Sequence, residues 1–76
     1  FVDHFLIRSP ELQATPAHVV LFDAQGRAVL FNRSNVGEGG QLLIDDRRLA
    51  DLPPGTYLMV VEQGGAVLRQ RIVRAP

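Results

Sequence analysis

The fold of this chain is decided by residues 53–62, which read PPGTYLMVVE. Proline lacks a backbone N–H and glycine adopts conformations closed to other residues, so Pro53, Pro54 and Gly55 end whatever structure precedes them. The following run of β-branched, aromatic and other apolar residues is typical of a β-strand. We predict a strand over 56–62, and the rest of the fold builds outward from it.

Strand and turn signals alternate on both sides of this stretch. Toward the C-terminus, residues 63–66 (QGGA) predict a hairpin turn. Toward the N-terminus, residues 23–26 (DAQG) predict another, because Asp23 can bond the backbone ahead of it and Gly26 accepts a positive φ. The predicted segments are strands over 1–8, 17–22, 27–31, 41–45, 56–62 and 67–74, a polar, glycine-rich connection over 32–40, and one helical turn over 46–52.

These segments predict an all-β protein, because none carries three turns of helical periodicity. Six or seven short strands indicate a sandwich or a small barrel. An Ig-like antiparallel β-sandwich is favoured by Gly55-Thr56-Tyr57, since a tyrosine that opens a late strand after a Pro-Gly turn is the pattern of a tyrosine corner, whose hydroxyl bonds a nearby backbone carbonyl. The alternative is an ordinary strand tyrosine. At 76 residues, we expect one domain over 1–76.

Composition narrows the classes of partner. Eight basic residues, all arginine, balance eight acidic ones, and this argues against nucleic acid or an anionic membrane as the main partner. The chain has no cysteine, so neither disulfides nor thiolate metal sites can reinforce it. No apolar run approaches the ~20 residues of a membrane span, and no signal peptide is present. Because the chain begins at Phe1, we expect a piece of a longer precursor.

The residues that could carry catalysis are scattered. A nucleophile needs an adjacent base that is itself oriented, and no candidate sits in the glycine-flanked elbow of the hydrolases. A histidine in a predicted strand is typical of a partly buried or surface position. We therefore predict that the chain is not an enzyme and uses no cofactor. The candidates considered are Ser9, Thr15, Ser34, Thr56, His4 and His18.

Three local patterns favour structural explanations over ligand sites. Asp45 and Asp46 are adjacent, so on a strand they point to opposite faces and cannot act as a pair. A Ca²⁺ site is disfavoured because the cations Arg47 and Arg48 follow and no spaced Asp or Asn ligands do, so we expect Asp46 to cap the turn at 46–52. Residues 37–40 (GEGG) resemble a phosphate loop only in glycine content, because they lack lysine and lead into a strand. Asn32-Arg33-Ser34 matches the glycosylation sequon, a weak signal on three residues.

An apolar surplus is the more informative feature. A sandwich strand with one solvated face should alternate apolar and polar residues. In 57–61, however, Leu58 and Val60 on one face are as apolar as Tyr57, Met59 and Val61 on the other. Two explanations stay open: the pleat is irregular, or another protein covers part of this surface.

The last predicted strand is cationic. Arg69 and Arg71 share one face and Arg74 lies beyond them. One interpretation is a solvated edge strand whose charges prevent aggregation. The other is a cationic C-terminal tag that a receptor recognises.

Three segments together resemble the motifs of one known family. Residues 19–29 (VVLFDAQGRAV), which include Gly26 and Arg27, resemble its "VxLFDxxGRxV" hairpin. Residues 44–57 resemble its "ID…L…LPxGxY" segment. Residues 60–61 and 64–65 resemble its final hairpin, and 71–74 (RIVR) its basic-aliphatic-aliphatic-basic ending. The match covers roughly 17–74, and the family it resembles is that of the C-terminal sorting domains of type IX secretion cargo proteins. The motif positions in the second segment are Ile44, Asp45, Leu49, Leu52, Pro53, Pro54, Gly55 and Tyr57.

The resemblance implies an Ig-like sandwich at the C-terminus of an attached cargo protein. The outer-membrane translocon of a Gram-negative bacterium would recognise the domain in the periplasm and export the cargo, and a sortase-like peptidase would remove the domain and anchor the cargo at the surface. The domain is then a substrate and not a catalyst. The residues expected to engage the translocon are Arg69, Arg71, Ile72, Val73 and Arg74.

The chain departs from the family pattern in two places. The Pro-Asn-Pro segment before the first strand is absent, and the basic pair of the ending is arginine where lysine is common. Two other functions remain open: an accessory Ig-like or carbohydrate-binding module of a secreted enzyme, and a structural module like the Ig-like domains of flagellar-hook cap proteins. A homodimer or strand swap is also open, because unpaired edges with apolar surface favour both.

Overall fold

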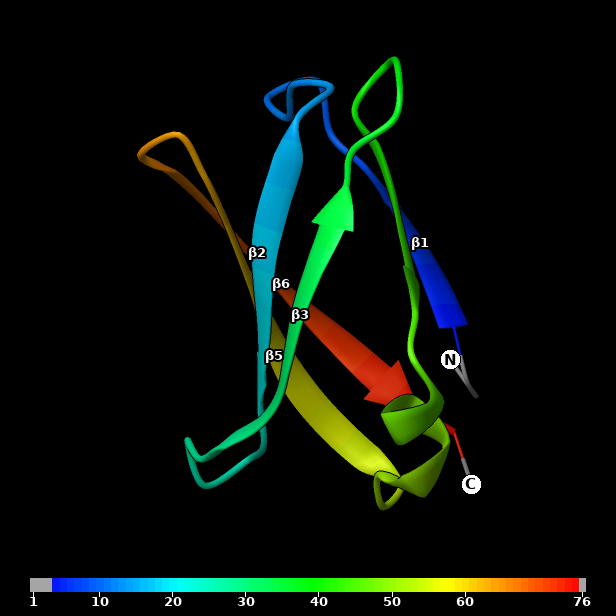
Figure 1. Ribbon diagram of the computed structural model, residues 1–76. Coiled ribbons are helices and arrows are strands. Elements are labelled where there is room, and N and C mark those ends of the chain that lie inside the picture. The colour runs from blue at the N-terminus through cyan, green and yellow to red at the C-terminus, as the bar shows by residue number, and fades with distance from the viewer. Residues whose placement is uncertain (1–3, 76) are drawn as a thin grey trace.

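The computed structural model describes residues 4–75 as two antiparallel sheets packed against each other (Figure 1). The small sheet pairs β1 with β4, and the large sheet has the order β3-β2-β5-β6. Residues 1–3 of the predicted first strand lie outside the described residues. The elements found there are β1 (His4–Arg8), β2 (Pro16–Phe22), β3 (Ala28–Asn35), β4 (Gln41–Asp45), the 3-10 helix η1 (Arg47–Asp51), β5 (Gly55–Gln63) and β6 (Ala66–Arg74).

This arrangement confirms the predicted Ig-like sandwich. The large sheet follows the C′-C-F-G order of the variable-type immunoglobulin sheet, and β1-β4 corresponds to the B-E pair opposite it. Both predicted hairpins are present, β2-β3 and β5-β6. The strand predicted first, β5, lies in the interior of the large sheet, between β2 and β6.

The core lies between the inner faces of the two sheets. Side chains alternate along each strand, so every second residue points into the core, and in β2, β4 and residues 57–61 of β5 these inward residues are buried. Leu49 of η1 covers one end of the core. The largest fully buried side chains are Val19, Leu21, Leu30, Leu42, Ile44, Leu49, Met59 and Val61.

The pleat of β5 is regular, so its apolar residues divide between the two faces of the sheet. Tyr57, Met59 and Val61 are buried, whereas Leu58 and Val60 point to the opposite side of the sheet. β5 keeps an uninterrupted register with both of its neighbours. An irregular pleat is therefore not the explanation. The second apolar set faces outward.

The predicted tyrosine corner is confirmed. The Tyr57 hydroxyl donates a hydrogen bond to the backbone carbonyl of Pro53, four residues upstream. The ring itself is buried at the start of β5. The bond ties the turn that precedes the strand to the edge of the core, as the Pro-Pro-Gly-Thr-Tyr pattern predicts.

The predicted helical turn is also confirmed, and Asp46 caps it. The Asp46 backbone is extended, and its side chain accepts a hydrogen bond from the backbone N–H of Arg48. This is the geometry of an N-cap residue. The turn buries Leu49 and leads into the Pro53–Gly55 segment.

One predicted boundary is wrong. Strand β3 continues to Asn35, through residues 32–35 that we expected in the polar connection. Asn, Arg and Ser give a weak strand signal, but the register with β2 runs on to Pro16↔Asn35. Asn32 and Ser34 face inward and are half-buried, which their hydrogen bonds to other polar groups allow.

Two loops are fixed at the opposite end of the molecule from η1. The Gly40 carbonyl accepts a hydrogen bond from the Ser9 backbone N–H at 3.0 Å, and the two backbones touch so closely that no side chain fits at Gly40. The Gln63 side chain bonds the loop before β2, because its amide pairs with the N–H and C=O of Gln13 and with Thr15. The side-chain amide of Gln63 thus bonds the loop backbone as a peptide group of a neighbouring strand would.

Candidate functional site

The outer face of the large sheet, on the side away from β1 and β4, carries a continuous apolar stripe. Val20 lies between Phe31 and Val60, and Phe22 lies beside Leu58 in the next row. Phe31 is 64% exposed and Leu58 40%, and the other three are half-buried. We call these five residues the apolar stripe. A row of apolar side chains across three strands is an uncommon surface for a small domain and typical of a contact site.

Positive charge borders the apolar stripe. Arg69 and Arg71 of β6 continue its two rows onto the edge strand, and both are exposed. Arg33 lies on the β3 side of the same face. Glu62 is the acidic residue that the four strands direct outward, so three arginines face one glutamate and the face is net positive.

The residues predicted to engage a translocon divide between the two faces of β6. Arg69, Arg71 and Val73 are exposed on the outer face, whereas Ile72 and Arg74 are half-buried on the inner face. Ile72 packs against the core. The structure thus brings Arg69, Arg71 and Val73 together on one accessible surface and separates the other two from it.

Arg74 has a structural contact of its own. Its guanidinium donates to the carbonyl of Ala50 in η1 at 3.0 Å and to that of Ala75 at 3.1 Å. Its Nε is buried and, among the described residues, has no hydrogen-bond partner. The side chain therefore fastens the end of β6 to η1.

The motif residues of the two other segments gather at one end of the sandwich. A pocket of about 340 Å³ lies between the β2-β3 turn and the turn that precedes β5. Gly26, with φ of 82°, shapes the first of these turns. Two segments that are separate in the sequence, 23–29 and 52–57, thus meet at one place. The pocket is lined by Asp23, Ala24, Gln25, Arg27, Val29, Leu52, Pro53, Pro54, Gly55, Thr56 and Tyr57.

Asp23 organises the β2-β3 turn. Its carboxylate accepts hydrogen bonds at 2.9 Å from the backbone N–H groups of Gln25 and Arg27, and Arg27 Nε donates to the second oxygen at 2.9 Å. The backbone N–H of Arg27, helped by its guanidinium, holds the pKa of Asp23 below its usual value. Asp23 and Arg27 are therefore turn-forming residues, as we predicted for Asp23.

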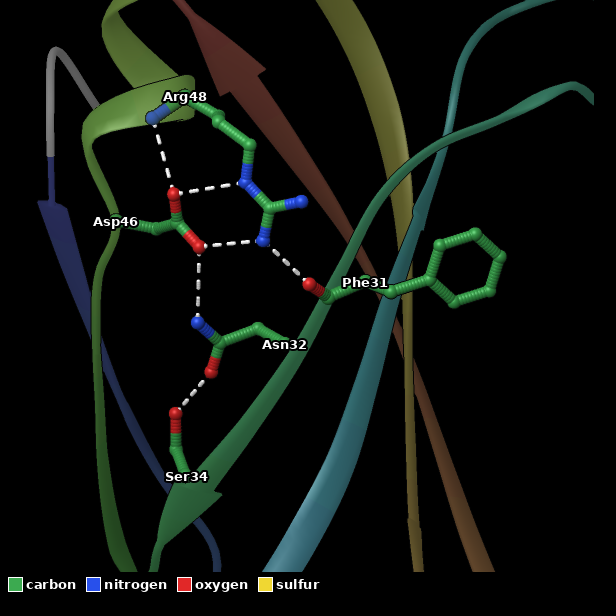
Figure 2. Close-up of polar contacts among 5 residues, drawn as sticks. All are labelled: Phe31, Asn32, Ser34, Asp46 and Arg48. Carbon is green, nitrogen blue, oxygen red and sulfur yellow. Dashed lines mark hydrogen bonds and ion pairs between the residues drawn. The ribbon is translucent and has the colours of Figure 1, made fainter.

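A polar cluster joins the two sheets on the β3 side (Figure 2). Asn32 Nδ2 donates to Asp46 at 3.0 Å, and the Ser34 hydroxyl donates to Asn32. Arg48 binds the same carboxylate with Nε and Nη2, at 3.0 and 2.8 Å. Its Nη2 also donates to the Phe31 carbonyl at 2.6 Å, while the Phe31 ring points away from the cluster in Figure 2.

The electrostatics of this cluster favour a charged Asp46. The hydrogen bonds and charge of Arg48, together with the Asn32 amide, hold the pKa of Asp46 far below its usual value. The same pair raises the pKa of Arg48. Because the Asn32 amide nitrogen is engaged here, the sequon residue serves as a link between sheets.

The remaining candidates for chemistry lie apart from one another. Ser9, Thr15 and Ser34 each use the hydroxyl in a hydrogen bond with an amide group. His4 and His18 are exposed on different sheets. Across residues 4–75, no three His, Cys, Asp or Glu side chains gather as metal ligands would.

Sequence reasoning missed Arg48 and Asn32 as partners of Asp46. The only local signal was the acid-base run 46–48, which we used to argue against a cation site. Asn32 lies 14 residues from Asp46, and only the tertiary fold brings them together. The exposure of Phe31 was missed as well, because an aromatic residue in an apolar run predicts burial.

Within the described part of the chain, no helix is long and apolar enough to cross a membrane. Comparison with protein-family models, with curated proteins and with solved structures finds no match to this chain.

Proposed function

We propose that this chain is a non-catalytic sorting domain, recognised by a type IX outer-membrane translocon that exports and surface-anchors an attached cargo. The observation that carries the proposal is the order and spacing of three motifs over residues 17–74. Two of them, around Asp23–Arg27 and Leu52–Tyr57, line one pocket, which is what a shared family architecture predicts. The third is the strand β6.

Two features of the outer face support a role in recognition. Arg69 and Arg71 lie exposed on β6 beside the apolar stripe, so one surface combines cationic and apolar contacts. Such a mixed surface can bind a partner with charge complementarity at its rim and apolar contact at its centre. Because Arg74 fastens β6 to η1, we assign it a supporting role in the domain.

The test is export of a fluorescent reporter placed between an N-terminal signal peptide and residues 1–76 in a type IX-competent cell. The upstream linker is restored. We expect the reporter at the surface or in the medium, and in the periplasm when the translocon is deleted. Periplasmic retention of a folded fusion in the competent cell would refute the proposal.

Point variants probe the surface more sharply than a truncation, because deletion of 69–76 removes most of β6. We expect Arg69→Glu/Arg71→Glu to retain the reporter in the periplasm. The matched control is Arg8→Glu/Arg47→Glu, which changes net charge equally at exposed positions on β1 and η1, outside the large sheet. If both pairs behave alike, the charge of β6 has no special part in export.

The exposed ring of Phe31 favours a second candidate, an accessory carbohydrate-binding module. Sugar sites present accessible aromatic rings, and Phe31 offers one on a flat sheet face. Of the other described aromatic residues, Tyr57 is buried, and Phe5 and Phe22 are half-buried. Binding to insoluble glycans that Phe31→Ala abolishes would favour this candidate over export.

A further inference from the structure

β6 ends the large sheet, and within residues 4–75 no strand pairs with its outer edge. It is nine residues long, has neither proline nor glycine, and keeps an unbroken register with β5. Natural sheets shorten, bulge or cover their edges to avoid unwanted pairing. The long and regular edge of β6 is therefore a feature that needs an explanation.

The turn before β6 determines which backbone groups this edge presents. Gly64 and Gly65 both have positive φ, 56° and 87°, as in a type I′ turn that joins Gln63 directly to Ala66. Residues that flank such a turn form a hydrogen-bonded pair, and hydrogen-bonded pairs then recur at every second residue. The backbone N–H and C=O groups of Val67, Arg69 and Arg71 therefore point away from β5.

At the other end of the sheet, one backbone group of the edge strand β3 is bonded from η1, because Arg48 donates to the Phe31 carbonyl (Figure 2). On β6, the contact of Arg74 with Ala50 lies at the end of the strand. Between Val67 and Arg71, no backbone hydrogen bond from the described residues reaches the outer edge.

Charge decides which strand can occupy the edge. The side chains of Arg69 and Arg71 project to the outer face, directly above backbone groups that would pair with an incoming strand. A second copy of β6 in antiparallel pairing centred on residue 69, 70 or 71 places arginine opposite arginine, which is destabilising. Acidic residues opposite Arg69 and Arg71 form favourable cross-strand pairs instead.

The inner face adds a second requirement. Leu68 and Ile72 point inward, pack against the core and are still half-exposed. Apolar residues of an added strand would lie beside them and extend the core. We infer that the edge of β6 from Val67 to Arg71 binds an extended segment of a partner protein in which acidic and apolar residues alternate, added as a fifth strand to the four-stranded sheet. This inference extends the proposed function. It depends on that function only for which partner protein supplies the segment.

The test is binding of a fluorescein-labelled peptide, Thr-Val-Glu-Val-Glu-Val-Thr, to the whole 76-residue chain. We expect Arg69→Glu/Arg71→Glu to lower the affinity about tenfold and to prefer the peptide with lysine at both glutamate positions. The charge-matched control Arg8→Glu/Arg47→Glu, at exposed positions on β1 and η1, should bind the first peptide nearly as the unchanged protein does. Far-UV circular dichroism checks that the variant is folded.

Two backbone readouts separate strand addition from simple charge attraction. Peptide binding should slow hydrogen exchange at the amides of Val67, Arg69 and Arg71, and N-methylation of the peptide on its pairing edge should abolish binding. If the N-methylated peptide binds equally well, the arginines act through the face and the inference is wrong. Protection of the same amides without peptide, with dimers in sedimentation, would make the occupant a second copy and also overturn it.

Binding and export can fail independently. Failure of every peptide to bind, with reporter export intact, removes the strand-addition inference and leaves the sorting proposal. Peptide binding with loss of export from the competent cell removes the sorting proposal and leaves a strand-accepting module.

Discussion

At the scale of single residues, the tyrosine corner is one hydrogen bond with a measurable contribution. Tyr57→Phe keeps the buried ring and removes the hydroxyl that bonds the Pro53 carbonyl. We expect the free energy of unfolding to fall by about 0.5 to 1.5 kcal/mol, because the Pro53 carbonyl loses this hydrogen bond. Urea unfolding followed by circular dichroism measures this. An unchanged midpoint would mean that water replaces the hydroxyl without cost.

Asp46 makes stability sensitive to acid. Its pKa is lowered in the folded state, so its contribution is complete above the unfolded value near 3.8 and is lost as pH falls toward the folded value. Asp46→Asn should destabilise the protein at pH 7 by about 1 to 2 kcal/mol, because Arg48 loses its carboxylate. The variant should also lose less stability than the unchanged protein between pH 5 and pH 2.

Asp45→Asn is the matched control for this experiment, because Asp45 is the adjacent residue, carries the same side chain and is exposed at the end of β4. At pH 7, Asp45→Asn should destabilise the protein less than Asp46→Asn, because it leaves the hydrogen bonds of Asp46 intact. An equal effect of the two substitutions would show that overall charge, and not the cluster around Asp46, determines the acid response.

At the scale of elements, alanine substitutions at two neighbouring glycines test the contact of the β3-β4 turn with the β1-β2 loop. Gly39 and Gly40 have nearly equal φ, 78° and 75°, so alanine meets the same backbone strain at both. A Cβ on Gly40 would lie 1.7 Å from the Ser9 carbonyl oxygen, whereas nothing lies within 4 Å at Gly39. Gly39→Ala should cost about 1 to 2 kcal/mol.

Gly40→Ala should cost at least about 2 kcal/mol more, because the two loops must separate. Thermal unfolding of the two variants side by side gives the difference. Equal melting temperatures would mean that the loops part at no cost and do not hold the sheets together.

The sequence predicted those elements whose signals are local. The turn at Asp23–Gly26, the hairpin turn at 63–66 and the cap at Asp46 each depend on residues within four positions of one another, and all three are confirmed. The tyrosine corner is equally local. For such features, the residues of the turn determine its backbone conformation, so they can be predicted from a single sequence.

Elements that depend on distant partners were not predictable. The end of β3 is polar, and Asn32 and Ser34 are accommodated inside because Asp46 supplies a partner from across the sandwich. In the candidate site, the sequence placed Arg69 and Arg71 on one face, but the inward direction of Arg74 depends on Ala50. Which of the expected recognition residues are accessible is therefore a tertiary property.

At the scale of the whole molecule, the sandwich separates two neighbouring apolar residues of β5. Met59 is fully buried and Leu58 is 40% exposed. Met59→Ala should cost about 2 to 5 kcal/mol, a large part of the stability of so small a domain. Leu58→Ala should cost less than about 1 kcal/mol.

Chemical unfolding of both variants tests the arrangement of the sheets. Similar losses at the two positions would mean that the outer face is covered in solution, by a second copy or otherwise. In that case the loss at Leu58 should depend on protein concentration, which dilution during the same experiment reveals.

The contact between Arg74 and Ala50 has a mechanical consequence. A pull on the C-terminal end of β6 loads the β5-β6 ladder one pair at a time, beginning with Gly55↔Arg74, so the strand unzips instead of shearing. The hydrogen bond from the Arg74 guanidinium to the Ala50 carbonyl of η1 must break before this first pair separates. Force measured on single molecules should therefore show an early peak that Arg74→Ala removes. A machine that grips this end could strip β6 from the sheet while β2, β3 and β5 stay together.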